Sequence, residues 1–273
     1  MIFIPSRGLV QVSRADQKIS ETDIERAFQA SRAISLSANQ EILDTFPHEI
    51  IIDGQASIRE ALGLRGIRLE AKVLCLAVFS PYLKNLTEAV LNAGLEIENI
   101  TPAVLASSKA LLTLSEKESG VCLLEIGGGN TSLAVFEEGS LVDAIVFPLG
   151  ANNITNDIAI VLKTEIETAE DIKREFASGS LRERSGRQLS RKKISAKAVS
   201  RVIEARSREI LDLAHKELKR IDKMKLPSGV VLTGGGAKLE KLVDLVKKEL
   251  KLPFRLGLPR GFEPEIEEPG WST

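Results

Sequence analysis

The sequence is poor in aromatic residues and cysteines, and neither sign of charge dominates. Aromatic residues fill 4% of the 273 positions, so Ile, Leu and Val supply most of the 43% hydrophobic content. The formal net charge of -1 gives no general reason to expect a nucleic-acid partner. Both cysteines, Cys75 and Cys122, lie in apolar runs. They indicate buried free thiols and argue against a disulfide or a metal site.

Long hydrophobic segments are also missing. The longest apolar run, residues 73–79, is far shorter than the roughly 18 residues that a membrane span requires. Residues 1–5 lack the charged start and long apolar middle of a signal peptide. We therefore expect a cytoplasmic protein that has no membrane segment of its own in this chain.

The periodicity of the apolar residues predicts a mixed α/β chain with a small first lobe. Ser20-Glu21-Thr22-Asp23 is a capping box that starts a helix running to about residue 34. Strand-like patterns precede and follow that helix, at residues 8–13, 41–52 (broken by Pro47) and 67–79. Further strands are predicted at 95–100, 121–124, 133–136, 141–147, 230–232 and 254–258, and helices after Ser80 and at 102–114, 150–159, 165–176, 196–221 and 239–250.

The octapeptide EIGGGNTS, residues 125–132, lies between two apolar runs and predicts a β-hairpin with three glycines at the bend. Glycines let backbone N–H groups point into a shared concavity, which is the usual way for a turn to receive a phosphate. An ordinary tight hairpin is an equally good interpretation of the octapeptide alone.

A second glycine turn, Thr233-Gly234-Gly235-Gly236, lies between a short strand and a helix. The N-terminus of such a helix favours an anion or the edge of a nucleotide. Neither turn has the Gly-Lys-Ser/Thr pattern of a P-loop or the spacing of a dinucleotide fingerprint. Two unrelated glycine turns are the alternative interpretation.

Seven segments, in order along the chain, resemble the FtsA family of actin-like bacterial cell-division proteins. They are GIRLEAK (66–72), LASS (105–108), EIGGGNT (125–131), GANNITNDIA (150–159), AEDIK (169–173), IEAR (203–206) and VLTGGGA (231–237). The resemblance implies an incomplete actin-like, ribonuclease H-like fold with a strand–helix–strand–strand (SHS2) lobe. It implies an interaction lobe like subdomain 1C at 1–80, a connecting helix and strand left from subdomain 1A at 81–101, and a second domain, 2A, at 102–273 that carries a 2B lobe at about 165–227.

The resemblance also implies a nucleotide site for ATP with Mg²⁺. Gly127, Gly128, Gly129 and Thr131 fall on the family's second phosphate-binding hairpin, and Gly234, Gly235 and Gly236 fall on its adenosine-side turn. Glu170 and Lys173, three residues apart on one helix face, fall where relatives contact the ribose and adenine. Without the resemblance, this pair is a typical solvated salt bridge.

Several departures from the family pattern weaken an enzymatic role. Glu125 replaces the leading Asp of the hairpin, Ser132 replaces the trailing Asp, and Ala103 occupies a position that is acidic in many ATP-hydrolysing relatives. We therefore predict no catalytic residue and no metal ligand, and any activity is expected to be weak ATP hydrolysis. The family's first phosphate hairpin and terminal membrane helix have no counterpart here, and residues 268–273 resemble the start of its next helix. We expect ATP binding to be weak or absent.

The function that the resemblance implies is that of a scaffold. It self-associates through the 1C-like lobe and links FtsZ, through the 2B-like lobe, to other division proteins at the inner face of the membrane. Arg201, Arg206 and Arg208 are candidates to meet acidic partner segments, and a solvated helix face is the alternative. A PilM-type scaffold of pilus assembly and a small-molecule ATP-dependent kinase are the other hypotheses. The kinase requires a carboxylate base near the phosphates.

Overall fold

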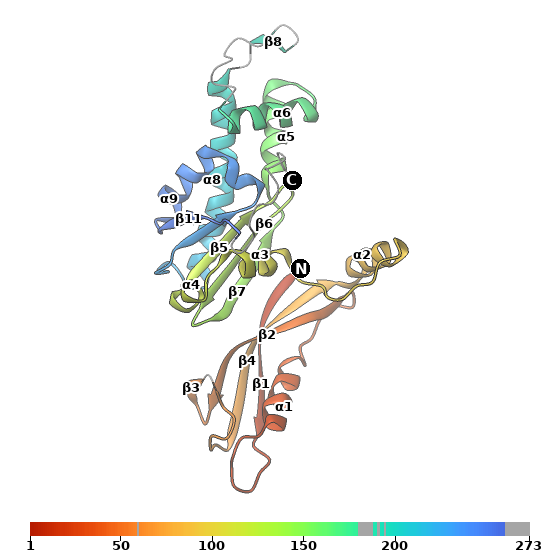
Figure 1. The fold of residues 1–273 in the computed structure, drawn as a ribbon, viewed down its shortest axis with the longest axis vertical. Helices are drawn as coiled ribbons and strands as arrows, with labels where there is room; N and C mark the ends of the chain where they lie inside the picture. The colour runs from red at the N-terminus through yellow and green to blue at the C-terminus, as the bar shows by residue number, and fades with distance from the viewer. Residues whose placement is uncertain (59, 180–187, 190–191, 194, 260–273) are drawn as a thin grey trace. The chain divides into compact units, whose positions relative to one another are not determined.

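The computed structural model of the chain describes residues 1–58, 60–179, 188–189, 192–193 and 195–259 (Figure 1). These residues form two compact units, one made of residues 1–102 with 136–145, the other of 103–135 with the chain from Val146 onward. Residues 268–273, which resemble the start of a family helix, lie outside the described residues. The assignment of roles to residues 1–80, 81–101 and 102–273 stays a prediction.

The first unit contains a four-stranded antiparallel sheet covered by one helix. The sheet has the order β1-β4-β2-β3, with β1 at Ile2–Gln11, β2 at Gln40–Ile52, β3 at Gln55–Ile58 and β4 at Arg68–Phe79. Helix α1 (Glu21–Ser31) packs on β1 and β4. The buried core of this unit consists of Ile19, Ala27, Ile52, Ala61, Leu69 and Ala71. The predicted strand–helix–strand–strand lobe is confirmed, with β3 as an additional short strand. Helix α2 (Ser80–Asn92) follows β4.

The start and position of α1 follow directly from its sequence. The predicted capping box is present, since the Ser20 hydroxyl accepts from the Asp23 N–H over 3.4 Å and the Asp23 carboxylate accepts from the Ser20 N–H over 3.1 Å. At Gly8 of β1, an added Cβ would collide with the backbone of Ala27 and Ser31. A residue without a side chain therefore allows the helix to lie directly on this strand.

Four predicted elements differ from the structure. The strand predicted at 8–13 begins earlier, since β1 runs from Ile2 to Gln11. Strand β2 continues through Pro47, and the pairing register with β4 shifts between Pro47 and Glu49, as in a β-bulge. The strand predicted at 95–100 is wrong, because none of the described strands pairs with this segment. The helix predicted to end at 114 stops at Leu111, and a second capping box, between Thr113 and Glu116, starts a separate helix.

The second unit contains most of a five-stranded sheet of order β11-β10-β5-β6-β7, in which residues 136–145 group with the first unit. Its strands are β5 (Val121–Ile126), β6 (Thr131–Glu137), β7 (Ser140–Phe147), β10 (Val230–Thr233) and β11 (Phe254–Leu256), of which β5, β10 and β11 are parallel. The helices of this unit are α3 (Ala103–Leu111), α4 (Leu114–Ser119), α5 (Ala151–Leu162), α6 (Ile166–Ala177), α8 (Ala196–Arg220), α9 (Glu240–Leu250) and the 3-10 turn η1 (Gly235–Lys238). A separate antiparallel pair is formed by the two-residue strands β8 (Gln188–Leu189) and β9 (Lys192–Lys193).

The helices pack in a continuous series, in which α8 contacts α9, α5 and α6, and α5 contacts α6. Helix α8 has the longest apolar stripe, with Val199, Ile203 and Ile210 buried, as its 3.6-residue spacing predicts. Across the described residues, every helix is too short or too polar to cross a bilayer.

A bidentate ion pair ties the edge strand β11 to helix α4. Arg255 Nε lies 2.7 Å from Glu116 Oε1, and Arg255 Nη2 lies 2.8 Å from Glu116 Oε2 and 2.8 Å from the Leu111 carbonyl. The hydrogen bonds from Arg255, together with those from Thr113, lower the pKa of Glu116 to about 2 despite its partial burial. The ionised carboxylate therefore joins the C-terminal strand to the α3–α4 corner.

We expect Glu116→Gln to destabilise the second unit by about 2 kcal/mol at pH 7, because the amide cannot replace the charged bidentate acceptor. The folded-state pKa of Glu116 lies below its ordinary value, so its contribution is present above about pH 4.5 and is lost as the pH falls toward 2. Urea unfolding followed by circular dichroism between pH 3 and 7 measures both effects.

The control for this substitution is Asp171→Asn, which neutralises an exposed carboxyl group on α6. Equal losses of stability in the two variants at pH 7, or a Glu116→Gln loss that is unchanged at low pH, would contradict the proposed role of the ion pair.

Candidate functional site

The two glycine turns lie side by side at one edge of the second unit's sheet. Strands β5 and β10 are parallel neighbours with Thr233 opposite Glu125, so the turns that follow them emerge at the same carboxyl edge. The approach is close, because an added Cβ on Gly234 would collide with the backbone of Ile126. The structure thus brings together the two segments that the sequence left open as unrelated turns.

The hairpin after β5 is held by the N-terminus of α5. The Gly127 N–H donates to the Asn130 carbonyl over 2.9 Å, which closes the turn. The first two N–H groups of α5 then donate to the hairpin: Ala151 N lies 2.9 Å from the Gly127 oxygen, and Asn152 N lies 2.8 Å from the Gly128 oxygen. Two N–H groups that a helix start leaves without intrahelical acceptors are thereby satisfied.

Thr131, predicted as a phosphate-side residue, faces the protein. It is fully buried, and its hydroxyl donates to the Leu149 carbonyl over 2.8 Å. Together with the α5 contacts, this bond fixes the hairpin to the segment that leads into α5. Gly150, the N-cap residue of α5, donates its N–H to Asn153 Oδ1 over 2.9 Å.

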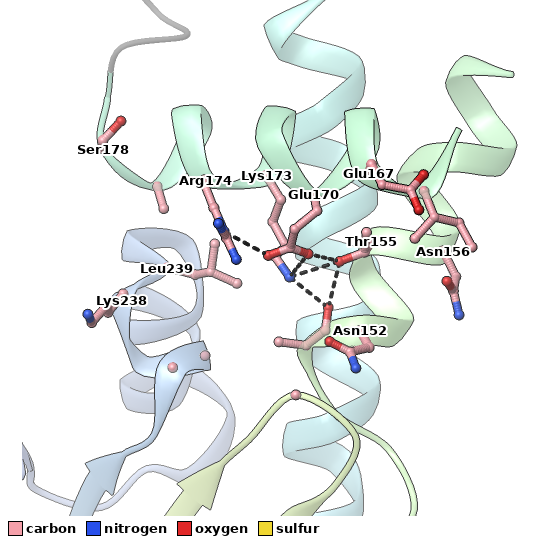
Figure 2. Close-up of a pocket in the computed structure, with 16 residues that line it drawn as sticks. Asn152, Thr155, Asn156, Glu167, Glu170, Lys173, Arg174, Ser178, Lys238 and Leu239 are labelled. Atoms are coloured by element: carbon pink, nitrogen blue, oxygen red, sulfur yellow. Dashed lines mark hydrogen bonds and ion pairs between the residues drawn. The ribbon is translucent and has the colours of Figure 1, made fainter. Parts of the chain in front are cut away.

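A cavity of about 840 Å³ opens beside the hairpin, between α5, α6 and η1 (Figure 2). Five of the nine predicted site residues line it: Gly128, Glu170, Lys173, Gly235 and Gly236. Gly127, Gly129, Thr131 and Gly234 are not among the lining residues, although the contacts of Gly127, Thr131 and Gly234 described above hold the two turns in place. The other lining residues are Ala151, Asn152, Thr155, Asn156, Ile166, Glu167, Arg174, Ala177, Ser178, Lys238 and Leu239.

The α6 wall of the cavity carries a cluster of ion pairs. Lys173 Nζ lies 2.6 Å from Glu170 Oε2 and 2.8 Å from Thr155 Oγ1, and the Thr155 hydroxyl contacts the same carboxylate oxygen over 2.5 Å. The other oxygen, Glu170 Oε1, lies 3.2 Å from Arg174 Nε. Burial raises the pKa of Glu170, but the hydrogen bonds from Lys173 and Thr155 and the two positive charges outweigh it, so the pKa lies below the ordinary value.

Several lining residues were missed from the sequence, although a signal for them was present. Asn152, Thr155 and Asn156 are spaced three and four residues apart, which places them on one face of a helix. They lie inside the segment 150–159 that resembles the family, and their polar character distinguishes that face from the apolar face with Ile154 and Ile158. Arg174, next to Lys173, was recognisable only once α6 was placed against the cavity (Figure 2).

Glu125, at the end of β5, faces helix α3. Burial raises the pKa of its carboxyl group, and a hydrogen bond with Ser107 of α3 reduces that shift. Its Oε2 atom is buried and has no hydrogen-bond partner among the described residues. Glu125 is not among the residues that line the cavity.

Comparison with solved structures establishes the class of fold. The PilM–PilN type IV pilus biogenesis complex matches 93% of this chain and 66% of its own with a TM-score of 0.64 at 19% identity. MreB5 of Spiroplasma citri, in a crystal structure bound to ADP, matches 66% of this chain and 61% of its own with a TM-score of 0.55 at 19% identity. Identities this low show the fold alone, which is that of the actin-like proteins.

Comparison of sequences establishes the family. The family model "Cell division protein FtsA" matches residues 122–273, and the model "SHS2 domain inserted in FTSA" matches residues 2–77. FtsA of Pseudomonas aeruginosa is 38% identical over 250 residues, which are 86% of this chain and 58% of that protein. The chain belongs to the FtsA family of cell-division proteins, and it spans less than two thirds of the length of this relative.

We expect Gly150→Ala to destabilise the second unit by about 2–3 kcal/mol, as overpacking against backbone atoms does. The new Cβ would collide with the Gly128 oxygen and lie 2.7 Å from Asn130 N and 2.8 Å from the Gly127 oxygen. Gly129→Ala is the matched control, because its Cβ would meet nothing within 4 Å. Thermal unfolding of the two variants should differ clearly, and similar midpoints would show that the hairpin does not dock as described.

A second prediction concerns the buried carboxyl group of Glu125. Its raised pKa means that the folded state disfavours the ionised form more than the unfolded state does, so stability from this group is present below about pH 4.5 and is lost as the pH rises through the folded-state pKa. We therefore expect Glu125→Gln to have a higher melting temperature than the unmodified chain at pH 7.5, and to lose this advantage near pH 4. A lower melting temperature at every pH would show that the carboxylate has a strong partner.

Proposed function

We propose that this chain belongs to an actin-like scaffold of bacterial cell division that binds a nucleotide in the cavity between α5, α6 and η1. The observation that carries the proposal is the glycine hairpin held on the N-terminus of α5, at the edge of that cavity. Family membership supports the role in division, and the actin-like fold supports nucleotide binding.

The cavity suits a nucleotide in size and in chemistry. Its volume of about 840 Å³ lies within the range that small-molecule and cofactor sites occupy. Gly128 presents backbone without a side chain at one end, where phosphates approach most closely. Glu170 and Lys173 lie at the other wall, on the side that we assign to the ribose and adenine, and the exposed Arg174 guanidinium suits the face of a base.

ATP with Mg²⁺ is the ligand that we propose, bound with the low affinity that the sequence predicts, on the strength of the family and of MreB5, whose crystal structure holds ADP. Within the described residues, no three side chains of His, Cys, Asp and Glu gather as a protein metal site would require. Mg²⁺ is commonly held by nucleotide phosphates and water with one or two carboxylates. We therefore assign it no protein ligand here.

We propose FtsZ as the partner of the 2B-like lobe and a second copy as the partner of the SHS2 lobe, at the inner face of the cytoplasmic membrane. Two of the three candidate arginines have partners within the chain. Arg206 makes a bidentate pair with Asp157, at 2.7 and 3.0 Å, and Arg208 pairs with Glu204 at 2.9 Å. Arg201 is exposed on α8, so we assign the contact with acidic segments of FtsZ to Arg201.

The two proposed activities can be separated by one pair of variants. Gly128→Val places a branched side chain at the phosphate end of the cavity, where the existing neighbour Asn152 leaves little room. We expect it to weaken ATP binding at least tenfold by isothermal titration calorimetry and to leave FtsZ co-sedimentation unchanged. Arg201→Glu, outside the cavity, should have the opposite pattern.

If ATP binds equally well to the unmodified chain and to Gly128→Val, the cavity is not the nucleotide site. If the unmodified chain and Gly128→Val both fail to co-sediment with FtsZ, with or without ATP, the scaffold proposal fails for this part of the chain.

A further inference from the structure

Lys173 is the most buried charged group at the cavity, and all of its donors are used within the protein. An ammonium group has three N–H donors and no acceptor. Lys173 Nζ lies 2.6 Å from Glu170 Oε2, 2.8 Å from Thr155 Oγ1 and 3.3 Å from the Ala151 oxygen, and its side chain is 9% exposed. Figure 2 shows these dashed contacts converging on one nitrogen. A ligand would have to displace one of them to be bound directly by Lys173.

The third contact reaches the peptide group that holds the glycine hairpin. The peptide between residues 151 and 152 offers its oxygen to Lys173 and its N–H to the Gly128 oxygen, the latter over 2.8 Å. A positive charge at the carbonyl end of a peptide group polarises it and strengthens the hydrogen bond that its N–H donates. Lys173 is therefore connected to the phosphate end of the cavity through a single peptide group.

We propose that Lys173 is a positioning residue that couples the α6 wall, through the 151–152 peptide, to the Gly127–Gly128 hairpin. Glu170 then remains the residue of this pair that offers the ligand an acceptor, through Oε1. Thr155 completes the arrangement, because its hydroxyl contacts both Lys173 and Glu170 and fixes their geometry. The proposal rests on the proposed nucleotide site and specifies how its two ends are connected.

Arg174 provides a matched control. Both Lys173 and Arg174 are paired with Glu170, but the Arg174 side chain is 55% exposed, whereas the buried Lys173 also donates to the Ala151 oxygen. Replacing either residue with Met removes one cation from Glu170. Only Lys173→Met also removes the contact with the 151–152 peptide.

The first measurement needs no nucleotide. Amide hydrogen exchange by NMR on the whole chain should show the Asn152 N–H exchanging about tenfold faster in Lys173→Met than in the unmodified protein, with sheet amides such as that of Val231 unchanged. Arg174→Met should leave Asn152 exchange unchanged. Equal exchange at Asn152 in both variants would overturn the coupling. If Lys173→Met fails to fold, the smaller change Lys173→Gln is measured in the same way.

The second measurement compares adenosine with ATP. If Lys173 acts through the hairpin, Lys173→Met lowers the affinity for ATP about tenfold more than the affinity for adenosine. If Lys173 instead contacts the ribose or base directly, both affinities fall by the same factor, and the proposal is wrong. An unmodified chain that binds neither compound refutes the proposed nucleotide site, whereas the exchange experiment still decides whether Lys173 positions the hairpin.

Discussion

The hydrogen bonds between the N-terminus of α5 and the hairpin after β5 are the constraint on which the rest of the second unit's site depends. A helix start leaves N–H groups without intrahelical acceptors, and here the Gly127 and Gly128 carbonyls accept from the first two of them. The fit requires Gly150 to lack a Cβ. It also turns the polar face of α5, with Asn152, Thr155 and Asn156, toward the cavity.

Three charged residues in this unit connect separate elements of the chain. Arg255 joins β11 to α4 through Glu116, Arg206 joins α8 to α5 through Asp157, and Lys173 joins α6 to α5 through Ala151 and Thr155. Each pair is at least partly buried, where charge-assisted hydrogen bonds are worth more than at the surface and are costly to leave unpaired.

Most sequence-based predictions that depended on residues close together in the chain were correct. The capping box at Ser20, the start of α2 at Ser80 and the apolar stripe of α8 depend on residues close in sequence, and they were predicted. Pairing between distant segments accounts for two of the failed predictions, whereas the missed break in the helix predicted at 102–114 comes from a local capping box at Thr113. Pro47 does not end β2, because a bulge lets β4 remain its partner, and residues 95–100 form no strand despite their apolar pattern.

The sequence alone determined the family, the two glycine turns and the residue types at the candidate site, because each is a matter of local pattern. Only the tertiary structure decided which of these residues line the cavity. It placed Gly128, Glu170 and the two glycines of η1 at the cavity, turned Thr131 toward Leu149, and used all three donors of Lys173 within the protein. Side-chain direction depends on which distant carbonyl, hydroxyl or carboxylate lies within hydrogen-bond reach, and spacing along the chain does not contain that information.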